Sequence, residues 1–267
     1  VSDGCLMTAA VYIITGASRG LGAALFTALA APERQLVGIA REGLPAELVQ
    51  QAQQKGAITE QIAADLSTAS GVQTVAAALH ELAIKPRTRC YLIHNAGTLD
   101  PMAFAGQWQD PTWVARSIAL NVSAPMQLTD AFLRATVGIP DRRLLFISSG
   151  AAHHPYPGWS VYGASKAALD QFARTVALEQ IMVQEGARVC ALAPGVIDTD
   201  MQKQIRAADS QQFPQRERFV SLKQEGRLQS PAEAAHRVAA WLHHAAFGET
   251  AVLDLRDIML STASALE

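Results

Sequence analysis

Apolar positions in this chain fall in short runs that alternate with longer stretches of helical periodicity. Most of the short runs are apolar almost throughout, which is typical of parallel strands covered by helices on both faces. They predict seven strands, at Val11–Thr15, Gln35–Ala40, Ile58–Ala63, Cys90–His94, Leu144–Ser148, Arg188–Ala193 and Ala251–Asp254. The stretches between them predict helices near residues 20–31, 45–55, 68–84, 111–137, 160–184 and 231–245. The alternation indicates an α/β protein with a doubly wound parallel sheet of about seven strands.

The segment 200–230 interrupts this alternation. It is rich in Gln, Arg, Lys and Glu and contains Pro214. Long polar insertions in compact domains often act as lids, although a solvated helical excursion has the same composition. We expect a substrate-side lid here, within a single domain that spans residues 8–256. Residues 1–7 are expected to be a leader or cloning remnant, and residues 257–267 a C-terminal tail.

Composition narrows the classes of function. Of 267 residues, 49% are apolar and 17% charged, which suits a large buried core and excludes intrinsic disorder. The net charge of −2 offers no general basic surface for nucleic acid or anionic membranes. The chain has no apolar run near the roughly 18 residues of a membrane span, and Cys5, Cys90 and Cys190 lack metal or disulfide spacing. We therefore expect a cytoplasmic protein with no nucleic-acid or membrane partner and no metal.

A glycine-rich loop follows the first predicted strand and precedes an alanine-rich helix. Glycines let the backbone approach a pyrophosphate, which the N–H groups and dipole of the helix N-terminus stabilise. This order predicts a single-domain Rossmann-type fold with a dinucleotide on the loop. The loop residues expected to bind the cofactor are Gly16, Ser18, Arg19, Gly20, Leu21 and Gly22. The same stretch also matches G-x-S-x-G, the nucleophile elbow of hydrolases, and local sequence does not separate the two interpretations.

Residues farther along the chain favour the nucleotide. A hydrolase needs an acid and a histidine after Ser18, and Asp198 and His236 occur only as isolated residues. A dinucleotide site places a ribose-reading residue about 20 positions after the loop. Arg41 stands there instead of an acid and suits a 2′-phosphate, with Arg19 as a second cation. The sequence thus favours NADP(H) over NAD(H), although the neighbouring Glu42 could accept a ribose hydrogen bond.

A tyrosine and a lysine stand four residues apart and therefore on one face of a predicted helix. Tyr162 and Lys166 form this pair, and Ser148 and Ser149 precede it at the end of a strand. A Tyr–Lys pair with this spacing is common by chance. Its position matters here because ligands of open α/β sheets bind at the carboxyl ends of the strands.

Together these motifs resemble the short-chain dehydrogenase/reductase family over residues 8–255 or so. The family's loop T-G-x-x-x-G-x-G matches the chain from Thr15. Further matches are Asp65 with Leu66 after the third strand, Asn95-Ala96-Gly97, Asn121 of the central helix, Ser149 thirteen residues before Tyr162, and the segment containing Pro194, Gly195, Ile197 and Thr199. The resemblance implies that these positions bind the cofactor, and that Asn121, Ser149, Tyr162 and Lys166 are catalytic.

The chemistry follows from the residue types. A hydride passes from the nicotinamide to a carbonyl carbon, and the oxygen must be protonated. We expect Tyr162 to donate that proton and Ser149 to hydrogen-bond the oxyanion. In the family, the counterpart of Asn121 holds a water that links the lysine to solvent. The ordinary pKa of a tyrosine is about 10, so Tyr162 can titrate near neutral pH only if its pKa falls by roughly 3. We expect the positive charges of Lys166 and the oxidised nicotinamide to lower it.

The residues around the tyrosine resemble one branch of the family. P-Y-x-G-W-x-x-Y, at residues 155–162, is similar to sepiapterin reductase and to microbial relatives that reduce benzil. Asp254 matches the acid that anchors the pterin in that branch, although a plain surface carboxylate fits it equally well. Tyr156 and Trp159 could wall a flat aromatic substrate or simply pack a loop. The adjacent His153 and His154 have no third metal ligand nearby.

The sequence therefore predicts an NADPH-dependent carbonyl reductase. Its expected substrate is an aromatic α-dicarbonyl such as benzil, or the side-chain ketone of a pterin such as sepiapterin. A reductase of other small ketones and a non-catalytic NADP-binding regulator are the alternatives. The resemblance also implies a homodimer, or a tetramer, paired through the helices near 111–137 and 160–184.

Overall fold

The computed structural model describes residues 10–83 and 88–258. The expected leader at residues 1–7, Cys5 within it, and most of the expected tail at 257–267 lie outside the described residues. Cys90 and Cys190 are both buried.

The centre of the molecule is one parallel sheet with the strand order β3-β2-β1-β4-β5-β6-β7. Its strands are β1 (Ala10–Thr15), β2 (Arg34–Ala40), β3 (Ile58–Ala63), β4 (Arg89–His94), β5 (Asp141–Ile147), β6 (Arg188–Ala193) and β7 (Val252–Asp254). The seven predicted strands are confirmed, and their ends move by at most three residues. The order reverses between β1 and β4, so a crevice for a ligand is expected at the carboxyl ends of these two strands.

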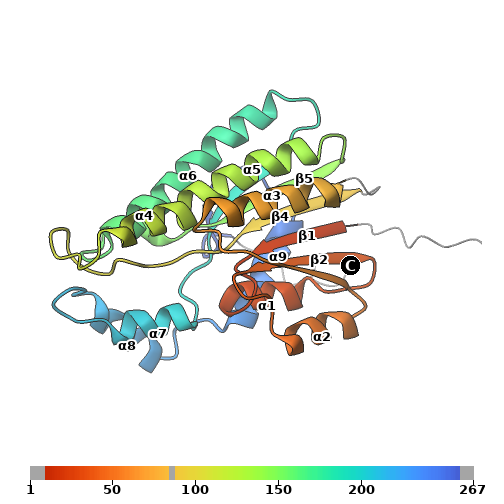
Figure 1. Ribbon diagram of the computed structural model, residues 1–267. Coiled ribbons are helices and arrows are strands. Elements are labelled where there is room, and N and C mark those ends of the chain that lie inside the picture. Colours follow the sequence, from red (N-terminus) through yellow and green to blue (C-terminus); the bar gives the residue numbers. More distant parts are fainter. Residues whose placement is uncertain (1–9, 84–87, 259–267) are drawn as a thin grey trace, which may run out of the picture.

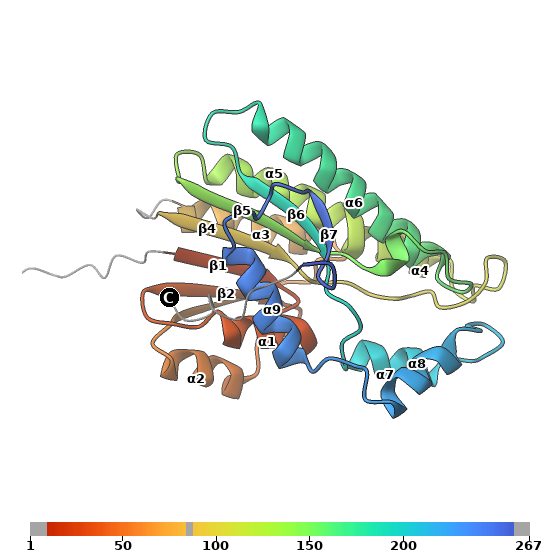
Figure 2. The same ribbon diagram turned by 180° about the vertical axis from the view of Figure 1, so that it is seen from behind.

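Helices cover both faces of the sheet (Figures 1 and 2). One face carries α1 (Gly20–Ala28), α2 (Ala46–Gln54) and α9 (Pro231–His243), and the other carries α3 (Ala69–Ala83), α4 (Thr112–Ile118), α5 (Ala124–Ala135) and α6 (Ser160–Ile181). Alternate residues of each central strand enter separate cores: Tyr12 and Ile14 face the α1–α9 side, whereas Val11 and Ile13 face the α3–α5–α6 side. Both faces of these strands are buried, and this explains their continuous apolar runs.

The helix predicted at 111–137 is divided by a wide turn. A π-helical turn at Ala119–Ser123 separates α4 from α5, and Asn121 is buried within it. Single π turns inside helices frequently mark functional sites. The periodicity of the sequence gave no sign of this turn, because α4 and α5 continue in nearly the same direction on either side of it.

The polar segment 200–230 forms two short helices, α7 (Asp200–Ala207) and α8 (Arg216–Gln224). They stand beyond the carboxyl ends of the strands, apart from the two helical layers (Figures 1 and 2). A separate apolar cluster attaches them to the body of the protein, in which Phe213 and Phe219 pack against Trp159. The segment is therefore anchored by a few aromatic side chains although its composition is polar.

Candidate active site

The glycine loop makes a tight turn between β1 and α1. Gly16 and Gly20 have φ values of 68° and 56°, a conformation that side chains disfavour. Side chains would also lack room, because a Cβ on Gly22 would lie 2.1 Å from the Gly16 carbonyl oxygen. The loop ends at Arg19, the N-cap of α1, whose side chain makes no capping hydrogen bond. The first N–H groups of α1 have no partner within the helix, so this end fits a phosphate.

Hydrogen bonds from β4 hold this loop in place. The side-chain amide of Asn95 donates to the carbonyl oxygens of Thr15 (3.0 Å) and Gly16 (3.1 Å). The Thr15 hydroxyl accepts the N–H groups of Asn95 and Ala96 at 3.0 Å each. These bonds join β1 and β4 where the strand order reverses. Asn95 therefore fixes the shape of the cradle, which comprises the glycine loop together with the start of α1.

The segment after β6 closes over the same loop. Pro194–Thr199 pairs with the chain before α9 through a parallel bridge between Ile197 and Gln229. A Cβ on Gly20 would lie 3.3 Å from the Cγ2 atom of Thr199. The structure thus brings the glycine loop close to the segment Pro194–Thr199, although about 180 residues separate the two in the chain.

Two residues expected to bind the cofactor, Arg41 and Asp65, lie at the ends of β2 and β3. Arg41 directly follows β2 and is exposed, and Asp65 follows β3. Hydrogen bonds from the Ser67 N–H (2.9 Å) and hydroxyl (2.7 Å) lower the pKa of Asp65, and the Arg41 charge lowers it further. Asp65 thus fixes the turn before α3, next to the buried Leu66, and lies within electrostatic reach of Arg41.

Three side chains from β5 and α6 converge at the carboxyl edge of the sheet. Tyr162 and Lys166 are 6% and 5% exposed. The Lys166 Nζ atom donates to the Ile147 carbonyl oxygen at 2.8 Å and lies 5.8 Å from the centre of the Tyr162 ring. Ser149 hydrogen-bonds Tyr162, whereas the hydroxyl of Ser148 donates elsewhere, to a carboxylate of α6. The structure therefore joins Ser149, rather than Ser148, to the tyrosine.

Burial dominates the electrostatics of this cluster. It raises the pKa of Tyr162, and the hydrogen bond with Ser149 offsets only part of the effect. It lowers the pKa of Lys166 to about 8, and the charge of Asp170 acts in the opposite direction. The lowered tyrosine pKa that the sequence led us to expect is therefore absent in the chain alone. A phenol that stays protonated near neutral pH is suited to donating a proton.

Asn121 ties the loop after β4 to the helix that carries the tyrosine and lysine. Its Oδ1 accepts the Thr98 N–H at 2.9 Å, and its Nδ2 donates to the Thr98 carbonyl (2.9 Å) and the Ser165 hydroxyl (3.2 Å). Gly97 is adjacent, because a Cβ there would lie 3.2 Å from Asn121 Oδ1 and 3.8 Å from Lys166 Nζ. A side chain at position 97 would therefore press on the Asn121 amide oxygen and come into contact with the lysine.

Aromatic rings form one wall beside Tyr162. The ring centre of Trp159 lies 5.4 Å from that of Tyr162, 5.2 Å from Tyr156 and 4.6 Å from Phe213, on which it stacks. A cavity of about 680 Å³ opens alongside, lined by residues of the segment 151–167 that include Tyr156 and Trp159. Trp159 therefore connects the tyrosine to the α7–α8 segment.

Asp254 lies at the end of β7, beside Ala193 of β6. Its carboxylate accepts three hydrogen bonds from Arg256, from the backbone N–H (2.9 Å), Nε (2.8 Å) and one terminal nitrogen (2.6 Å). These bonds lower the pKa of Asp254. Arg256 is also within electrostatic reach of Tyr156. The carboxylate of Asp254 is thus engaged by an arginine that is itself within electrostatic reach of the aromatic wall.

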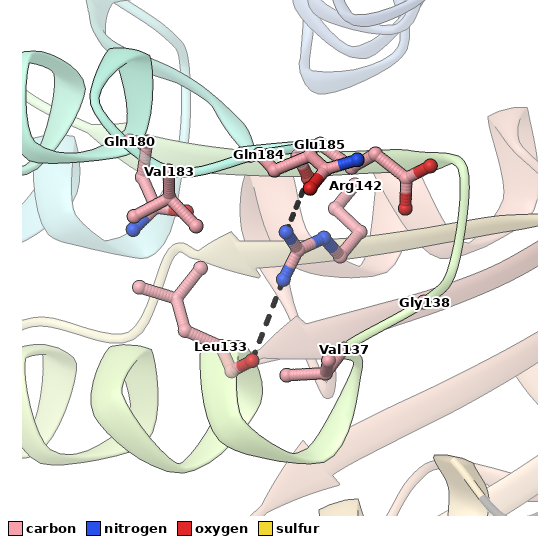
Figure 3. Close-up of a pocket in the computed structure, with 8 residues that line it drawn as sticks. All are labelled: Leu133, Val137, Gly138, Arg142, Gln180, Val183, Gln184 and Glu185. Carbon is pink, nitrogen blue, oxygen red and sulfur yellow. Dashed lines mark hydrogen bonds between the residues drawn. The ribbon is translucent and has the colours of Figure 1, made fainter.

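A second cavity, of about 380 Å³, lies at the opposite end of β5 (Figure 3). Arg142 crosses it and donates to the carbonyl oxygens of Leu133 (3.4 Å) and Glu185. Arg142 is the second residue of β5, whereas Ser149 follows the end of the strand. This cavity is therefore separate from the Ser–Tyr–Lys cluster.

The hydrolase interpretation of the glycine loop finds no supporting partners. Asp198 pairs with Lys223 at 2.5 Å and Arg206 at 3.6 Å, and His236 lies exposed on α9. Within residues 10–83 and 88–258, no three His, Cys, Asp or Glu side chains are grouped so that they could hold a metal ion. None of the helices described here has the length and apolar character to cross a membrane.

Two features of the site escaped the sequence analysis. Phe213 and Phe219, isolated in a polar segment, support Trp159 from outside the sheet. Asp170, one turn beyond Lys166, is a buried acid within reach of His153. An acid on the apolar stripe of a predicted helix was a usable signal for the second feature. Only the folded chain could reveal the first.

Comparisons with known proteins agree with this geometry. A family model described as short chain dehydrogenase matches residues 10–210. A benzil reductase ((S)-benzoin forming) of Bacillus cereus is 33% identical over 246 residues, 90% of this chain and 97% of the relative. The sepiapterin reductase of Meriones unguiculatus is 36% identical over 259 residues, 93% of this chain and 97% of the relative. A short-chain dehydrogenase from Sphingobium yanoikuyae, solved in complex with NADPH, has a TM-score of 0.71 at 25% identity, over 91% of this chain and 86% of that one.

The sheet, the glycine loop and the Ser–Tyr–Lys cluster define an oxidoreductase that acts on carbonyl or alcohol groups with a nicotinamide cofactor. The chain belongs to the short-chain dehydrogenase family. Within it, the relatives named here place it beside benzil and sepiapterin reductases.

Replacing Gly22 by Val tests the cradle. Its Cβ would meet the Gly16 carbonyl, so the loop must open and lose its fit to the cofactor. We expect Gly22→Val to weaken NADPH binding at least about tenfold, equivalent to about 1.4 kcal/mol, measured by fluorescence titration. Gly226→Asn is the control, because it changes a glycine with φ of 66° that has open space around it. Normal binding by folded Gly22→Val would contradict the assignment.

Proposed function

We propose that this protein is an NADPH-dependent carbonyl reductase that acts on aromatic α-dicarbonyls of the benzil kind. The observation that carries the proposal is the buried Tyr162 phenol, which contacts Ser149, faces the Lys166 ammonium and stands beside the Trp159 ring. A proton donor, an oxyanion partner and an aromatic wall are thus adjacent.

The cradle fits a phosphorylated dinucleotide. Gly22 leaves no room for a side chain, and the start of α1 offers unpaired N–H groups to a pyrophosphate. Arg41 and Arg19 are exposed cations beside this edge, suited to a 2′-phosphate. The residues that would hold NADPH are Gly16, Ser18, Arg19, Gly20, Leu21, Gly22, Arg41, Asp65, Leu66, Asn95, Ala96, Gly97, Tyr162, Lys166, Pro194, Gly195, Ile197 and Thr199.

When bound, the reduced nicotinamide supplies a hydride to the carbonyl carbon of the substrate. Tyr162 gives its proton to the carbonyl oxygen as negative charge develops there, and Ser149 donates a hydrogen bond to the same oxygen. The Lys166 charge, held in place by the Ile147 carbonyl, stabilises the tyrosinate that remains. Asn121 secures the loop beside Lys166, where a water path from the lysine to solvent completes the relay.

The surroundings of Asp254 favour a diketone over a pterin. A pterin would offer amino and ring N–H donors to this carboxylate, but Arg256 already donates to it. A benzil-like diketone offers no donors and needs only flat apolar faces, which Trp159 and Tyr156 provide. The α7–α8 segment, anchored through Phe213, is the substrate-side lid of this proposal.

Sepiapterin is the second candidate substrate. It is favoured by the 36% identity to a sepiapterin reductase and by the match of Asp254 to the acid that anchors the pterin in that branch. It requires Arg256 to release the carboxylate. A reductase of other small ketones uses the same residues, whereas a non-catalytic NADP-binding regulator has no use for the Ser149–Tyr162–Lys166 cluster.

The proposed enzyme is a cytoplasmic homodimer, or a tetramer built from such dimers. Large apolar side chains stand exposed near the end of α6, with Leu178, Ile181 and Met182 at 66%, 80% and 87% exposure, and Val137 at 77% follows α5. Covering these side chains with a second copy of the same helices would remove apolar surface from water.

Tyr162→Phe tests the proton donor. The ring keeps its contact with Trp159 but loses the hydroxyl, so we expect kcat to fall at least about 100-fold while NADPH binding is retained. Loss of NADPH absorbance with benzil measures turnover, and a binding titration measures the cofactor. Tyr91→Phe removes a hydroxyl that bonds Asp141 at the far end of the sheet and should leave kcat unchanged. A Tyr162→Phe enzyme with the parental rate would refute the mechanism.

Arg41→Ala tests the cofactor preference. A lost hydrogen bond to a charged group costs about 1.5–3 kcal/mol, so KM for NADPH should rise roughly 10- to 100-fold, with little change for NADH. Steady-state kinetics with both cofactors provide the measurement. Arg134→Ala, which breaks an exposed pair with Asp130 on α5, serves as the control. An unchanged ratio of the two KM values would show that Arg41 does not read the 2′-phosphate.

Arg256→Ala tests the substrate. We expect the parent enzyme to have a higher kcat/KM for benzil than for sepiapterin. Freeing Asp254 should raise the sepiapterin value relative to benzil, whereas Arg227→Ala, which removes an exposed pair with Glu225, should leave the ratio unchanged. A parent enzyme that prefers sepiapterin would instead support the pterin alternative.

A further inference from the structure

A buried carboxylate lies directly behind the catalytic residues. Asp170 follows Lys166 by one turn of α6, and only 1% of its side chain is exposed. Its Oδ1 accepts a hydrogen bond from the Ser148 hydroxyl at 2.5 Å. Its Oδ2 lies 3.0 Å from the Nε2 atom of His153. An isolated buried carboxylate is unfavourable, so partners of this kind are required to keep it charged.

The contact with Ser148 connects Asp170 to the proton donor and its oxyanion partner. Ser148 stands between Ile147, whose carbonyl oxygen accepts the Lys166 ammonium, and Ser149, which hydrogen-bonds Tyr162. A bond from Ser148 to α6 therefore fixes the end of β5 against the helix that carries the tyrosine and the lysine. The proton donor Tyr162 and the hydrogen-bond donor Ser149 are then held in one rigid segment.

The charge of Asp170 also acts on the lysine. Burial lowers the pKa of Lys166 to about 8, and Asp170 is the group that opposes this shift. Burial raises the pKa of Asp170, while the Ser148 hydrogen bond and the charges of His153, Arg174 and Lys166 lower it. Cys190 on β6 is a further titratable neighbour, whose pKa is raised chiefly by its own burial.

His153 connects the buried pair of Asp170 and Lys166 to solvent. Its side chain is 48% exposed, and it reaches Asp170 from the loop after β5. The His153 charge lowers the pKa of Asp170, and the half-exposed ring is in contact with solvent. This contact accounts for one of the two adjacent histidines that the motif analysis left without a role.

We propose that Asp170 is a positioning residue of the reduction: it keeps the Lys166 ammonium charged inside the protein and fixes the strand end that carries Ser149, with His153 as its countercharge from solvent. This inference rests on the proposed function of Tyr162 and Lys166. Asp170 adds a further group to the proposed relay of Tyr162 and Lys166, on the side of the lysine that faces away from the tyrosine.

The first test observes the lysine without turnover. The chain has five lysines, so NMR of protein labelled at lysine Cε can follow Lys166 through a pH titration, with Lys166→Arg for assignment. We expect Asp170→Asn, which keeps an acceptor for Ser148 but loses the charge, to lower the Lys166 midpoint by about one pH unit. Ser148→Ala keeps the charge and should shift it less. Glu179→Gln, at an exposed acid of the same helix, should not shift it.

The second test follows turnover. The reduction uses the charged lysine, so activity is present below the Lys166 pKa and is lost as pH rises through it. Because Asp170 raises that pKa, Asp170→Asn should move the alkaline limb of kcat to lower pH, with KM for NADPH nearly unchanged. Ser148→Ala should lower kcat and move the limb less than Asp170→Asn does.

The two tests separate failure of this inference from failure of the proposed function. A Lys166 midpoint that is the same in the parent and in folded Asp170→Asn overturns the inference, whichever substrate is reduced. Absence of carbonyl reduction by the parent overturns the proposed function alone, since the NMR titration still reports on Asp170. Should Asp170→Asn not fold, carboxyl NMR of the parent decides, because a protonated Asp170 at pH 7 contradicts the inference and an ionised one supports it.

Discussion

The burial of one ammonium group sets the requirements for the rest of the site. Lys166 is 5% exposed, and an ammonium removed from water must recover its lost hydration from fixed partners. The Ile147 carbonyl, at the end of β5, supplies one partner. Asp170 supplies the opposite charge one turn away. The lysine therefore requires the end of β5, the packing of α6 and the residues after the strand to be in these positions.

The same requirement explains the irregular segment in the central helix. A π turn places Asn121 where its amide can bond Thr98 and Ser165 together. Without that turn, the regular helix would present a different side chain to the loop. The loop after β4 carries Gly97 next to the lysine, so its position limits the space around the ammonium. Backbone irregularity here serves the packing of a charged group.

The cofactor cradle and the aromatic wall depend on different kinds of packing. The cradle depends on the absence of side chains, because Gly22 and Gly16 allow backbone segments to approach within distances that a Cβ would prevent. The wall depends on large rings, with Trp159 stacked on Phe213 and in edge contact with Tyr162. Glycine spacing leaves a regular pattern in the sequence. Ring stacking between distant segments leaves none.

The sequence by itself determined the α/β class, the seven strands and the order of glycine loop, serine, tyrosine and lysine, because these depend on local periodicity and short spacings. The spacing of Ser230 and Glu233, which form a reciprocal capping box at the start of α9, is local in the same sense. Only the tertiary structure decided that Arg256 engages Asp254 and that Phe213 stacks on Trp159. It also decided that burial raises the pKa of Tyr162 in the chain itself. Each of these outcomes depends on burial or on contacts between residues far apart in the chain, and neither is encoded in spacing along it.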